Sequence, residues 1–502
     1  MHYRSTRNPD LSLVDSQVIL QGISEEGGLF VPESLPNLHK EFSFLSHLDY
    51  SSLAKHIFSS FLTDFSQEEI DECVDSAYTA EKFGGKEPVR LIPLTEQGES
   101  KYLLELWHGP TCAFKDMALQ ILPRFLTKAM AKAAQGKRAL ILTATSGDTG
   151  KAALEGFRDV PGTEIFVFYP QDGVSPMQKR QMETQEGENV TVCVIDGNFD
   201  DAQTAVKRVF TDPAMRAALA RHGMMFSSAN SINWGRLLPQ IVYYFYAYFE
   251  LVRAGAVSLG DAVNVAVPTG NFGNILAAYY ASRMGLPVQN FICASNANRV
   301  LTDFIRTGTY DRRREFFTTM SPSMDILISS NLERLLYALS GEDSDMLSRW
   351  MAELSETGMY SVSPEVAEKI KSSFFGGACA DTAAARTIRD LWEREQYLCD
   401  PHTAVGVDVY RQYVKETGDA ATPTIIASTA SPYKFTKSVL KSFERPIPED
   451  EFEAMESLQT ITNTEAPEQL WGLRDKLVRF RETVSQSQIE SFIRTSVGIE
   501  GL

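Results

Sequence analysis

One lysine in this chain stands in a segment that suits covalent chemistry. Residues 108–116 read His-Gly-Pro-Thr-Cys-Ala-Phe-Lys-Asp, so Lys115 lies between an aromatic ring and a carboxylate, where a helical pattern begins. Partial burial lowers the pKa of a lysine amine, and an amine without its proton forms a Schiff base with a carbonyl group. Most lysines are solvated surface charges, so the segment alone does not define a site. It marks Lys115 as a candidate nucleophile.

Two glycine-containing loops, each between a strand pattern and a helix pattern, are candidate anion sites. Residues 144–150 read Ala-Thr-Ser-Gly-Asp-Thr-Gly, and residues 268–274 read Pro-Thr-Gly-Asn-Phe-Gly-Asn. Backbone N–H groups in such a turn, together with the positive end of the following helix, attract phosphate or carboxylate. An ordinary tight turn uses the same glycines and binds nothing. Two such loops together with Lys115 favour a cofactor site.

Alternating strand and helix patterns must position these segments. Between residues 102 and 298 the alternation is regular, which predicts mainly parallel sheets with helices on both faces. A late strand precedes Thr429, and ligands of open α/β sheets bind at the ends of strands. The expected strands are residues 139–143, 165–169, 190–195, 263–267, 288–294 and 424–427.

The remaining patterns divide the chain into four parts. The N-terminal part shows helix patterns, for example over residues 66–83, and little strand character. Further helices are expected at residues 331–339, 363–375 and 470–478. The expected parts are an N-terminal helical cap (1–99), an α/β core with Lys115 (100–298), a mostly helical segment that returns to that core (299–440), and a C-terminal helical extension (441–502).

Composition and charge narrow the class of protein. The chain has 502 residues, 43% of them hydrophobic and 23% charged, as is ordinary for a globular protein with a large core. Its formal net charge of −17 argues against a nucleic-acid-binding surface. The first ten residues are polar and no apolar stretch reaches membrane length, so we expect neither a secretory signal nor a membrane partner.

The cysteines indicate a reducing compartment. Their wide spacing, with no Cys-x-x-Cys pair, is typical of free thiols in a cytoplasmic protein rather than of disulfides or a zinc site. No cluster of side chains has the spacing of metal ligands, so no metal is expected. Cys112 lies three residues before Lys115 and could be read as a nucleophile, but buried packing is the favoured interpretation. The six are Cys73, Cys112, Cys193, Cys293, Cys379 and Cys399.

Further motifs follow in a fixed order along the chain. With the lysine segment and the two loops, they resemble those of the threonine synthases, which are pyridoxal 5'-phosphate (PLP) enzymes of fold type II. The resemblance extends from residue 3 to about residue 440, and nothing is carried over to the tail beyond it. The motifs lie at residues 3–7, 26–32, 181–185, 197–201, 230–236, 323–326, 400–405 and 428–432.

The resemblance implies a fold and a cofactor site. It implies two open, mainly parallel sheets flanked by helices, with Lys115 as the catalytic residue that holds PLP through a Schiff base. Thr429 would be the hydroxyl partner of the pyridine nitrogen, which suits β and γ chemistry over transamination. The cofactor phosphate would lie on Gly270, Asn271, Phe272, Gly273 and Asn274, whose glycines would tolerate no bulky Cβ.

The resemblance also implies a substrate, O-phospho-L-homoserine. Thr145, Ser146 and Thr149 would bind its carboxylate, whereas Asp148 is a doubtful ligand because two carboxylates repel each other. Arg236, or else Lys179 or Arg180, would bind its phosphate, although a surface ion pair is an equal alternative. A satisfied structural histidine is the favoured interpretation of His402.

The implied activity is that of a carbon–oxygen lyase acting on phosphates, which makes L-threonine as the last step of threonine biosynthesis. Two alternatives stay open: a related phospho-lyase that releases 2-oxobutyrate, and a PLP-holding protein without catalysis. Intact Lys115, both loops and Thr429 argue against the second. The expected oligomeric state is a monomer or a homodimer.

Overall fold

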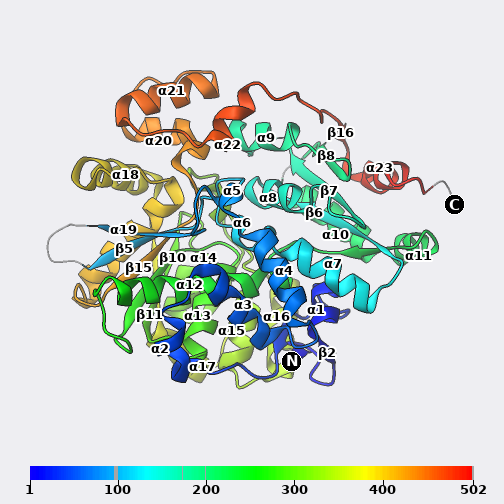
Figure 1. The fold of residues 1–502 in the computed structure, drawn as a ribbon, viewed down its shortest axis with the longest axis horizontal. Helices are drawn as coiled ribbons and strands as arrows, with labels where there is room; N and C mark the ends of the chain where they lie inside the picture. Colours follow the sequence, from blue (N-terminus) through cyan, green and yellow to red (C-terminus); the bar gives the residue numbers. More distant parts are fainter. Residues whose placement is uncertain (95–99, 172, 198, 500–502) are drawn as a thin grey trace.

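The computed structural model describes the chain except for residues 95–99, 172, 198 and 500–502. The expected boundary after residue 99, and Asn198 of one motif, therefore lie outside the described residues. Two open sheets with helices on their faces form most of the molecule (Figure 1). This arrangement confirms the predicted α/β fold with two mainly parallel sheets.

The larger sheet has six strands in the order β14-β11-β10-β15-β5-β4. Neighbouring strands are parallel except for β4, which runs antiparallel to β5 at one edge. The central neighbours β10 and β15 lead into the loop at residues 269–272 and into Thr429, respectively. The strands are β4 (Arg90–Leu94), β5 (Lys101–Glu105), β10 (Val263–Pro268), β11 (Val288–Ser295), β14 (Phe374–Ala378) and β15 (Thr424–Ser428).

The smaller sheet has five parallel strands in the order β16-β8-β7-β6-β9. Its strand β6 leads through residues 145–147 into helix α8 (Asp148–Phe157). The six strands expected from the sequence are all present in the two sheets. The strands of the smaller sheet are β6 (Arg138–Ala144), β7 (Thr163–Pro170), β8 (Val190–Ile195), β9 (Met224–Ser227) and β16 (Thr483–Val484).

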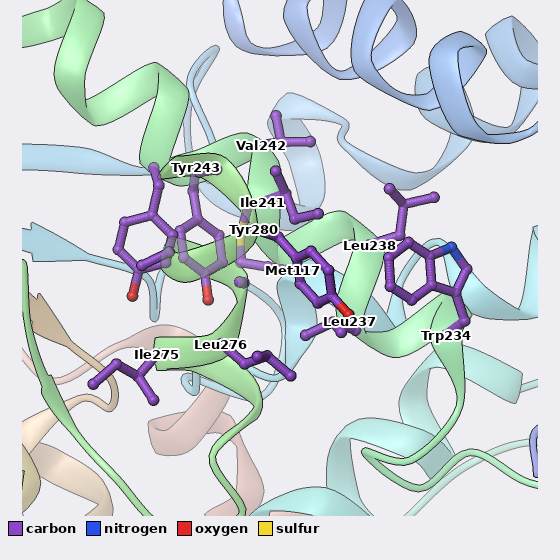
Figure 2. Packing of buried hydrophobic residues seen from close by; sticks show 14 of the residues in the cluster. Met117, Trp234, Leu237, Leu238, Ile241, Val242, Tyr243, Ile275, Leu276 and Tyr280 are labelled. Carbon is purple, nitrogen blue, oxygen red and sulfur yellow. The ribbon is translucent and has the colours of Figure 1, made fainter. Parts of the chain in front are cut away.

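Helix α12 (Trp234–Arg253) fixes the segments of the site relative to one another. Asn233 caps its start by accepting a hydrogen bond from the N–H group of Gly235. Figure 2 shows side chains of α12 packed with side chains of α13 (Gly273–Arg283) and with Met117, two residues after Lys115. Burial of each large apolar side chain stabilises the fold by about 1.5–3 kcal/mol. This cluster therefore fixes the helices that follow Lys115 and the loop at 269–272.

The N-terminal part differs from the expected helical cap with little strand character. Three short strands form an antiparallel sheet in the order β2-β1-β3, so the expectation of little strand character was wrong there. The expected helix over residues 66–83 is divided into α4 (Gln67–Ala77) and α5 (Ala80–Phe83), because Thr79 caps a new helix. The three strands are β1 (His2–Ser5), β2 (Ser12–Val14) and β3 (Phe30–Pro32).

Two expected helices end earlier than predicted. Helix α17 (Pro364–Ser373) stops where strand β14 begins, because Phe374 joins the sheet beside β11. The helix expected over residues 470–478 is replaced by α22 (Glu468–Trp471) and a 3-10 turn, η4 (Gly472–Arg474). The chain then extends to β16, which pairs with β8, and ends in α23 (Ile489–Ser496), which packs beside α10 (Phe199–Thr211).

The remaining helices cover the sheets and the N-terminal region. Within the described residues, no helix is both long enough and apolar enough to span a bilayer. The remaining elements are α1 (Asp15–Gln21), η1 (His39–Glu41), α2 (Phe42–Leu45), α3 (Tyr50–Phe61), α6 (Asp116–Leu119), α7 (Leu122–Ala133), α9 (Pro176–Glu183), α11 (Pro213–Arg221), α14 (Val300–Thr307), β12 (Thr309–Asp311), η2 (Pro322–Met324), α15 (Leu332–Leu339), α16 (Ser344–Thr357), β13 (Met359–Ser361), α18 (Asp381–Glu395), α19 (Pro401–Thr417), η3 (Pro432–Phe435), α20 (Thr436–Ser442), α21 (Glu451–Thr462) and η5 (Gln486–Gln488).

Candidate active site

The segment before Lys115 is paired with the segment that follows strand β15. Ala113 and Ala430 form an isolated antiparallel bridge. The N–H group of Phe114 donates to the carbonyl of Thr429 at 2.8 Å. These backbone contacts bring Lys115 and Thr429 together, although they are far apart in the sequence. Among the described residues, no hydrogen bond engages the buried Thr429 hydroxyl.

A compact turn holds Lys115 at the start of α6. The buried Asp116 carboxylate accepts hydrogen bonds from the N–H group of Thr111 at 2.8 Å and from its hydroxyl at 2.7 Å. Cys112 adopts a left-handed backbone conformation, with φ of 58°, inside this turn. Burial raises the pKa of the Cys112 thiol to about 12, so the thiol is inert at neutral pH. The packing interpretation of Cys112 is confirmed.

Lys115 lies in an environment that releases its proton. The amine is buried, lies 3.7 Å from Asp148 Oδ2, and is 4.7 Å from the centre of the Phe114 ring. Burial lowers its pKa to about 8; Asp148 opposes this change, while the charges of Lys434 and Arg236 reinforce it. Near neutral pH, a larger fraction of this amine is therefore unprotonated than for an ordinary lysine. This is the state that attacks a carbonyl group.

Asp148 is the negative group at the centre of the site. Its Oδ1 atom lies 2.5 Å from Lys434 Nζ and accepts a hydrogen bond from Gln178 Nε2 at 2.8 Å. Its Oδ2 atom accepts from the hydroxyl of Ser323 at 3.2 Å. Burial alone would raise its pKa, but the charges of Lys434 and Lys115, with these hydrogen bonds, hold it well below the usual range. The sequence analysis did not predict the contacts of Lys434, Gln178 and Ser323 with Asp148.

The loop after β6 uses one of its three predicted hydroxyl groups internally. Thr145 Oγ1 accepts hydrogen bonds from the N–H groups of Gly147 at 3.0 Å and Gly150 at 2.9 Å. These bonds shape the turn that presents Asp148. Ser146 and Thr149 are half-buried, and their hydroxyl groups make no hydrogen bond to another described residue.

The loop at residues 270–274 has the properties of an anion cradle. Within the described chain, the backbone N–H groups of these five residues have no acceptor, and α13 begins at Gly273. The side chain of Asn274 accepts a hydrogen bond from the Tyr244 hydroxyl, while its buried Nδ2 atom has no partner. Unsatisfied buried donors at a helix N-terminus favour a bound anion.

The two glycines of this loop differ in how much space surrounds them. The left-handed residue is Phe272, with φ of 62°, and neither glycine has a positive φ. A Cβ atom on Gly270 would lie 2.7 Å from the carbonyl oxygen of Ser323. A Cβ on Gly273 would make only ordinary contact, 3.6 Å from Asn331 Nδ2. Within the protein itself, a Cβ atom is therefore excluded at Gly270 and accommodated at Gly273, while the expectation that a bulky side chain at either position weakens cofactor binding stays a prediction.

Arg236, in the first turn of α12, is a buried cation. Its guanidinium donates to the carbonyl of Ala229 at 2.6 Å, while its Nε atom has no partner. Among the described residues, no carboxylate lies within 4.0 Å of it, so the surface ion pair considered as its alternative is excluded. Burial lowers its pKa to about 10, which leaves it charged at neutral pH.

Lys179 and Arg180 were the two other candidates for binding the substrate phosphate. Both of them contact other groups of the protein instead. Lys179 is half-exposed and lies 3.6 Å from Glu183. The Arg180 guanidinium donates to backbone carbonyls of the C-terminal tail, those of Leu473, Arg474 and Lys476.

His402 is fully engaged by the protein. Its Nδ1 atom lies 2.8 Å from Asp400 Oδ1, and its Nε2 atom accepts the N–H group of Ser323 at 3.1 Å. These contacts require the tautomer with the proton on Nδ1 and make His402 a support for the Ser323 segment. All six cysteines are free and buried. In the described part of the chain, no three His, Cys, Asp or Glu side chains are grouped as metal ligands.

These features fit pyridoxal 5'-phosphate. The buried amine of lowered pKa suits its aldehyde, the cradle of free N–H groups suits its phosphate, and the free buried hydroxyl suits its ring nitrogen. The fold and this site define a PLP-dependent enzyme of fold type II. Residues 82–428 match the family described as pyridoxal-phosphate dependent enzyme. Residues 2–78 match the threonine synthase N terminus, and residues 403–493 match the threonine synthase C-terminal family. The chain belongs to the threonine synthase family.

Individual relatives agree with this assignment. The chain is 34% identical to the threonine synthase of Saccharomyces cerevisiae, over 91% of this chain and 93% of that protein. It is 38% identical to threonine synthase-like 1 of Macaca fascicularis, over 86% of this chain but only 58% of the length of that relative. A solved structure of PLP-bound threonine synthase from Brucella melitensis superposes with a TM-score of 0.86 at 35% identity, covering 99% of both chains.

The close approach of Gly270 to Ser323 gives a prediction about stability. Gly270→Ala should lower the free energy of unfolding of the cofactor-free protein by about 1–3 kcal/mol, because the added methyl group overlaps a backbone carbonyl. Urea unfolding followed by fluorescence measures this change. Gly273→Ala is the matched control and should leave stability within about 0.5 kcal/mol of the starting protein. Equal effects of the two substitutions would contradict the steric argument.

Proposed function

We propose that this protein is a threonine synthase, which converts O-phospho-L-homoserine and water into L-threonine and phosphate. The observation that carries the proposal is the excess of buried positive charge around Lys115. Lys115 and Lys434 share a single carboxylate, that of Asp148, and the nearby Arg236 has no carboxylate within 4.0 Å among the described residues. A dianionic phosphate ester compensates such an excess, whereas an unphosphorylated amino acid does not.

Lys115 would hold the cofactor and then move protons. Its lowered pKa supports both tasks, because a group near neutral pKa both accepts and donates a proton readily. PLP, when bound, supplies an electron sink for negative charge on the substrate carbons. In the overall reaction the phosphate leaves from Cγ, water adds at Cβ, and the proton lost from carbon returns to Cγ, which becomes the methyl group.

The other site residues would bind and orient. The free N–H groups of residues 270–274 support a role in holding the cofactor phosphate. The free hydroxyl of Thr429 supports a hydrogen bond to the ring nitrogen without forcing its protonation. Ser146 and Thr149 support binding of the substrate carboxylate, to which Thr145 contributes mainly by shaping the loop. The Arg236 guanidinium, whose Nε atom has no partner among the described residues, supports binding of the substrate phosphate.

We also propose that the enzyme works in the cytoplasm as a monomer or homodimer, with neither nucleic acid nor membrane as a partner. Six free buried cysteines fit a reducing compartment, and a net charge of −17 disfavours nucleic acid.

The test incubates the purified protein with PLP and O-phospho-L-homoserine, and assays phosphate, threonine and 2-oxobutyrate separately. Equal amounts of phosphate and threonine are expected. Phosphate with 2-oxobutyrate would identify the alternative phospho-lyase, and no product would indicate a PLP-holding protein. Lys115→Ala should lose the visible absorbance of covalently bound cofactor and all turnover while keeping its circular dichroism spectrum. Turnover in that variant would show that Lys115 is not the residue that binds the cofactor covalently.

Arg236→Gln should lower kcat/KM for the phosphorylated substrate about tenfold to a hundredfold, because hydrogen bonds to a charged group contribute about 1.5–3 kcal/mol. Inorganic phosphate should also inhibit this variant more weakly than the starting enzyme. Lys179→Gln is the matched control, since Lys179 is half-exposed and paired with Glu183. A decrease in kcat/KM that is confined to Lys179→Gln would instead indicate that the substrate phosphate binds at α9.

Substitutions at Thr429 test the proposed contact with the ring nitrogen. Thr429→Val removes the hydroxyl at nearly constant shape and should slow turnover about tenfold without changing the product, in line with a lost hydrogen bond of about 1.5 kcal/mol. Thr429→Asp should increase transamination relative to threonine formation, because a carboxylate favours a protonated ring nitrogen. Product ratios and cofactor spectra measure both effects. Unchanged rates and ratios would mean that Thr429 does not face the ring.

A further inference from the structure

Lys434 is a buried cation that the proposed function counts among the positive charges of the site, but to which it assigns no contact with cofactor or substrate. It lies in η3, which follows the Thr429 segment, and its side chain is fully buried. A lysine is almost never fully buried unless its charge is paired. Its contacts therefore indicate why the fold tolerates it.

Lys434 joins three separate segments of the site. Its Nζ atom lies 2.5 Å from Asp148 Oδ1, at the start of α8. The same atom donates to the carbonyl of Thr111, in the turn that holds Lys115, at 2.9 Å. Because Lys434 occupies Oδ1, the other oxygen of Asp148 is the one that lies 3.7 Å from Lys115 Nζ.

The charges that face Lys115 come from three other elements. Asp148 on α8 favours the protonated amine, while Lys434 on η3 and Arg236 on α12 disfavour it. On its own segment, the titratable neighbours are the buried Asp116 and Cys112. Burial of Asp116 raises the pKa of its carboxyl to about 6, and its carboxylate is bonded to Thr111, away from the amine. Lys434 therefore acts on Lys115 in two ways, through its own charge and through its hold on Asp148.

We propose that Lys434 is a positioning residue, which orients Asp148 toward Lys115 and thereby sets the pH range in which the Lys115 amine is free of its proton. The proposal rests on the assignment of Lys115 as the residue that binds PLP covalently. Without Lys434, the Asp148 carboxylate would have Lys115 as its remaining cation within 4.0 Å among the described residues. The loss of the positive charge of Lys434, which lies near Lys115, would be a second change in the surroundings of the amine. Both changes favour the protonated amine.

The experiment measures how fast the full-length, cofactor-free chain takes up PLP covalently at a series of pH values. The rate rises as the amine loses its proton and levels off above the pKa of Lys115, so its midpoint is expected near pH 8. Lys434→Met should move this midpoint to higher pH by about one unit or more, which slows uptake at pH 7 about tenfold. Asp148→Asn should move the midpoint to lower pH, because Asp148 favours the protonated amine.

Two controls make the result specific. Lys437→Met removes a partly exposed lysine one helical turn further on, which pairs with Glu451 at 3.1 Å, and should leave the midpoint unchanged. Lys434→Arg keeps the charge and should retain most of the original profile. A merely structural role for Lys434 would lower the amount of folded protein without moving the midpoint.

Folded Lys434→Met protein with an unchanged midpoint would overturn the proposal, as would an equal shift in Lys437→Met. If Lys434→Met does not fold, Asp148→Asn is compared with the double variant Asp148→Asn/Lys434→Met. The double variant should have the higher midpoint, since a cation is lost, and equal midpoints would overturn the proposal. Covalent uptake by Lys115→Ala would instead refute the assignment of Lys115, so the two failures are distinguishable.

Discussion

Compensation of buried charge is the constraint on which this site depends. Within the described chain, Asp148 provides the only carboxylate within 4.0 Å of either Lys115 or Lys434. An uncompensated buried ion costs several kcal/mol, so the position of this one carboxylate determines whether both lysines can be buried. Gln178 and Ser323 hold the carboxylate in place, and His402 supports Ser323 in turn. A series of polar contacts thus connects the start of α8, next to the smaller sheet, with helix α19.

The fold brings these groups together because both sheets direct the ends of their strands to one place. Strand β6 of the smaller sheet leads to Asp148, and strands β10 and β15 of the larger sheet lead to the anion cradle and to Thr429. The packing of α12, α13 and Met117 in Figure 2 then fixes the distance between these ends. The chemistry therefore depends on an apolar cluster that contains none of the reacting groups.

Much of this arrangement could be predicted from the sequence, because apolar strands and glycine loops are local signals. The six strands and the segment of Lys115 belong to this class. Lys434 was missed because its burial depends on Asp148, which is distant in the chain. The one available signal was the position of this lysine between two aromatic residues, Tyr433 and Phe435, shortly after strand β15. The strands near the N-terminus were missed because elements of three or four residues are too short to show a period of two.

The pairing of β16 with β8 has a consequence for biosynthesis. Strand β16 covers an edge of the smaller sheet, and an uncovered edge is a template for pairing with other chains. Its residues, Thr483 and Val484, are synthesised long after the rest of that sheet. A ribosome-bound nascent chain therefore carries this edge of the smaller sheet unpaired until residues 483–484 have been made, and during that time the edge can pair with other chains.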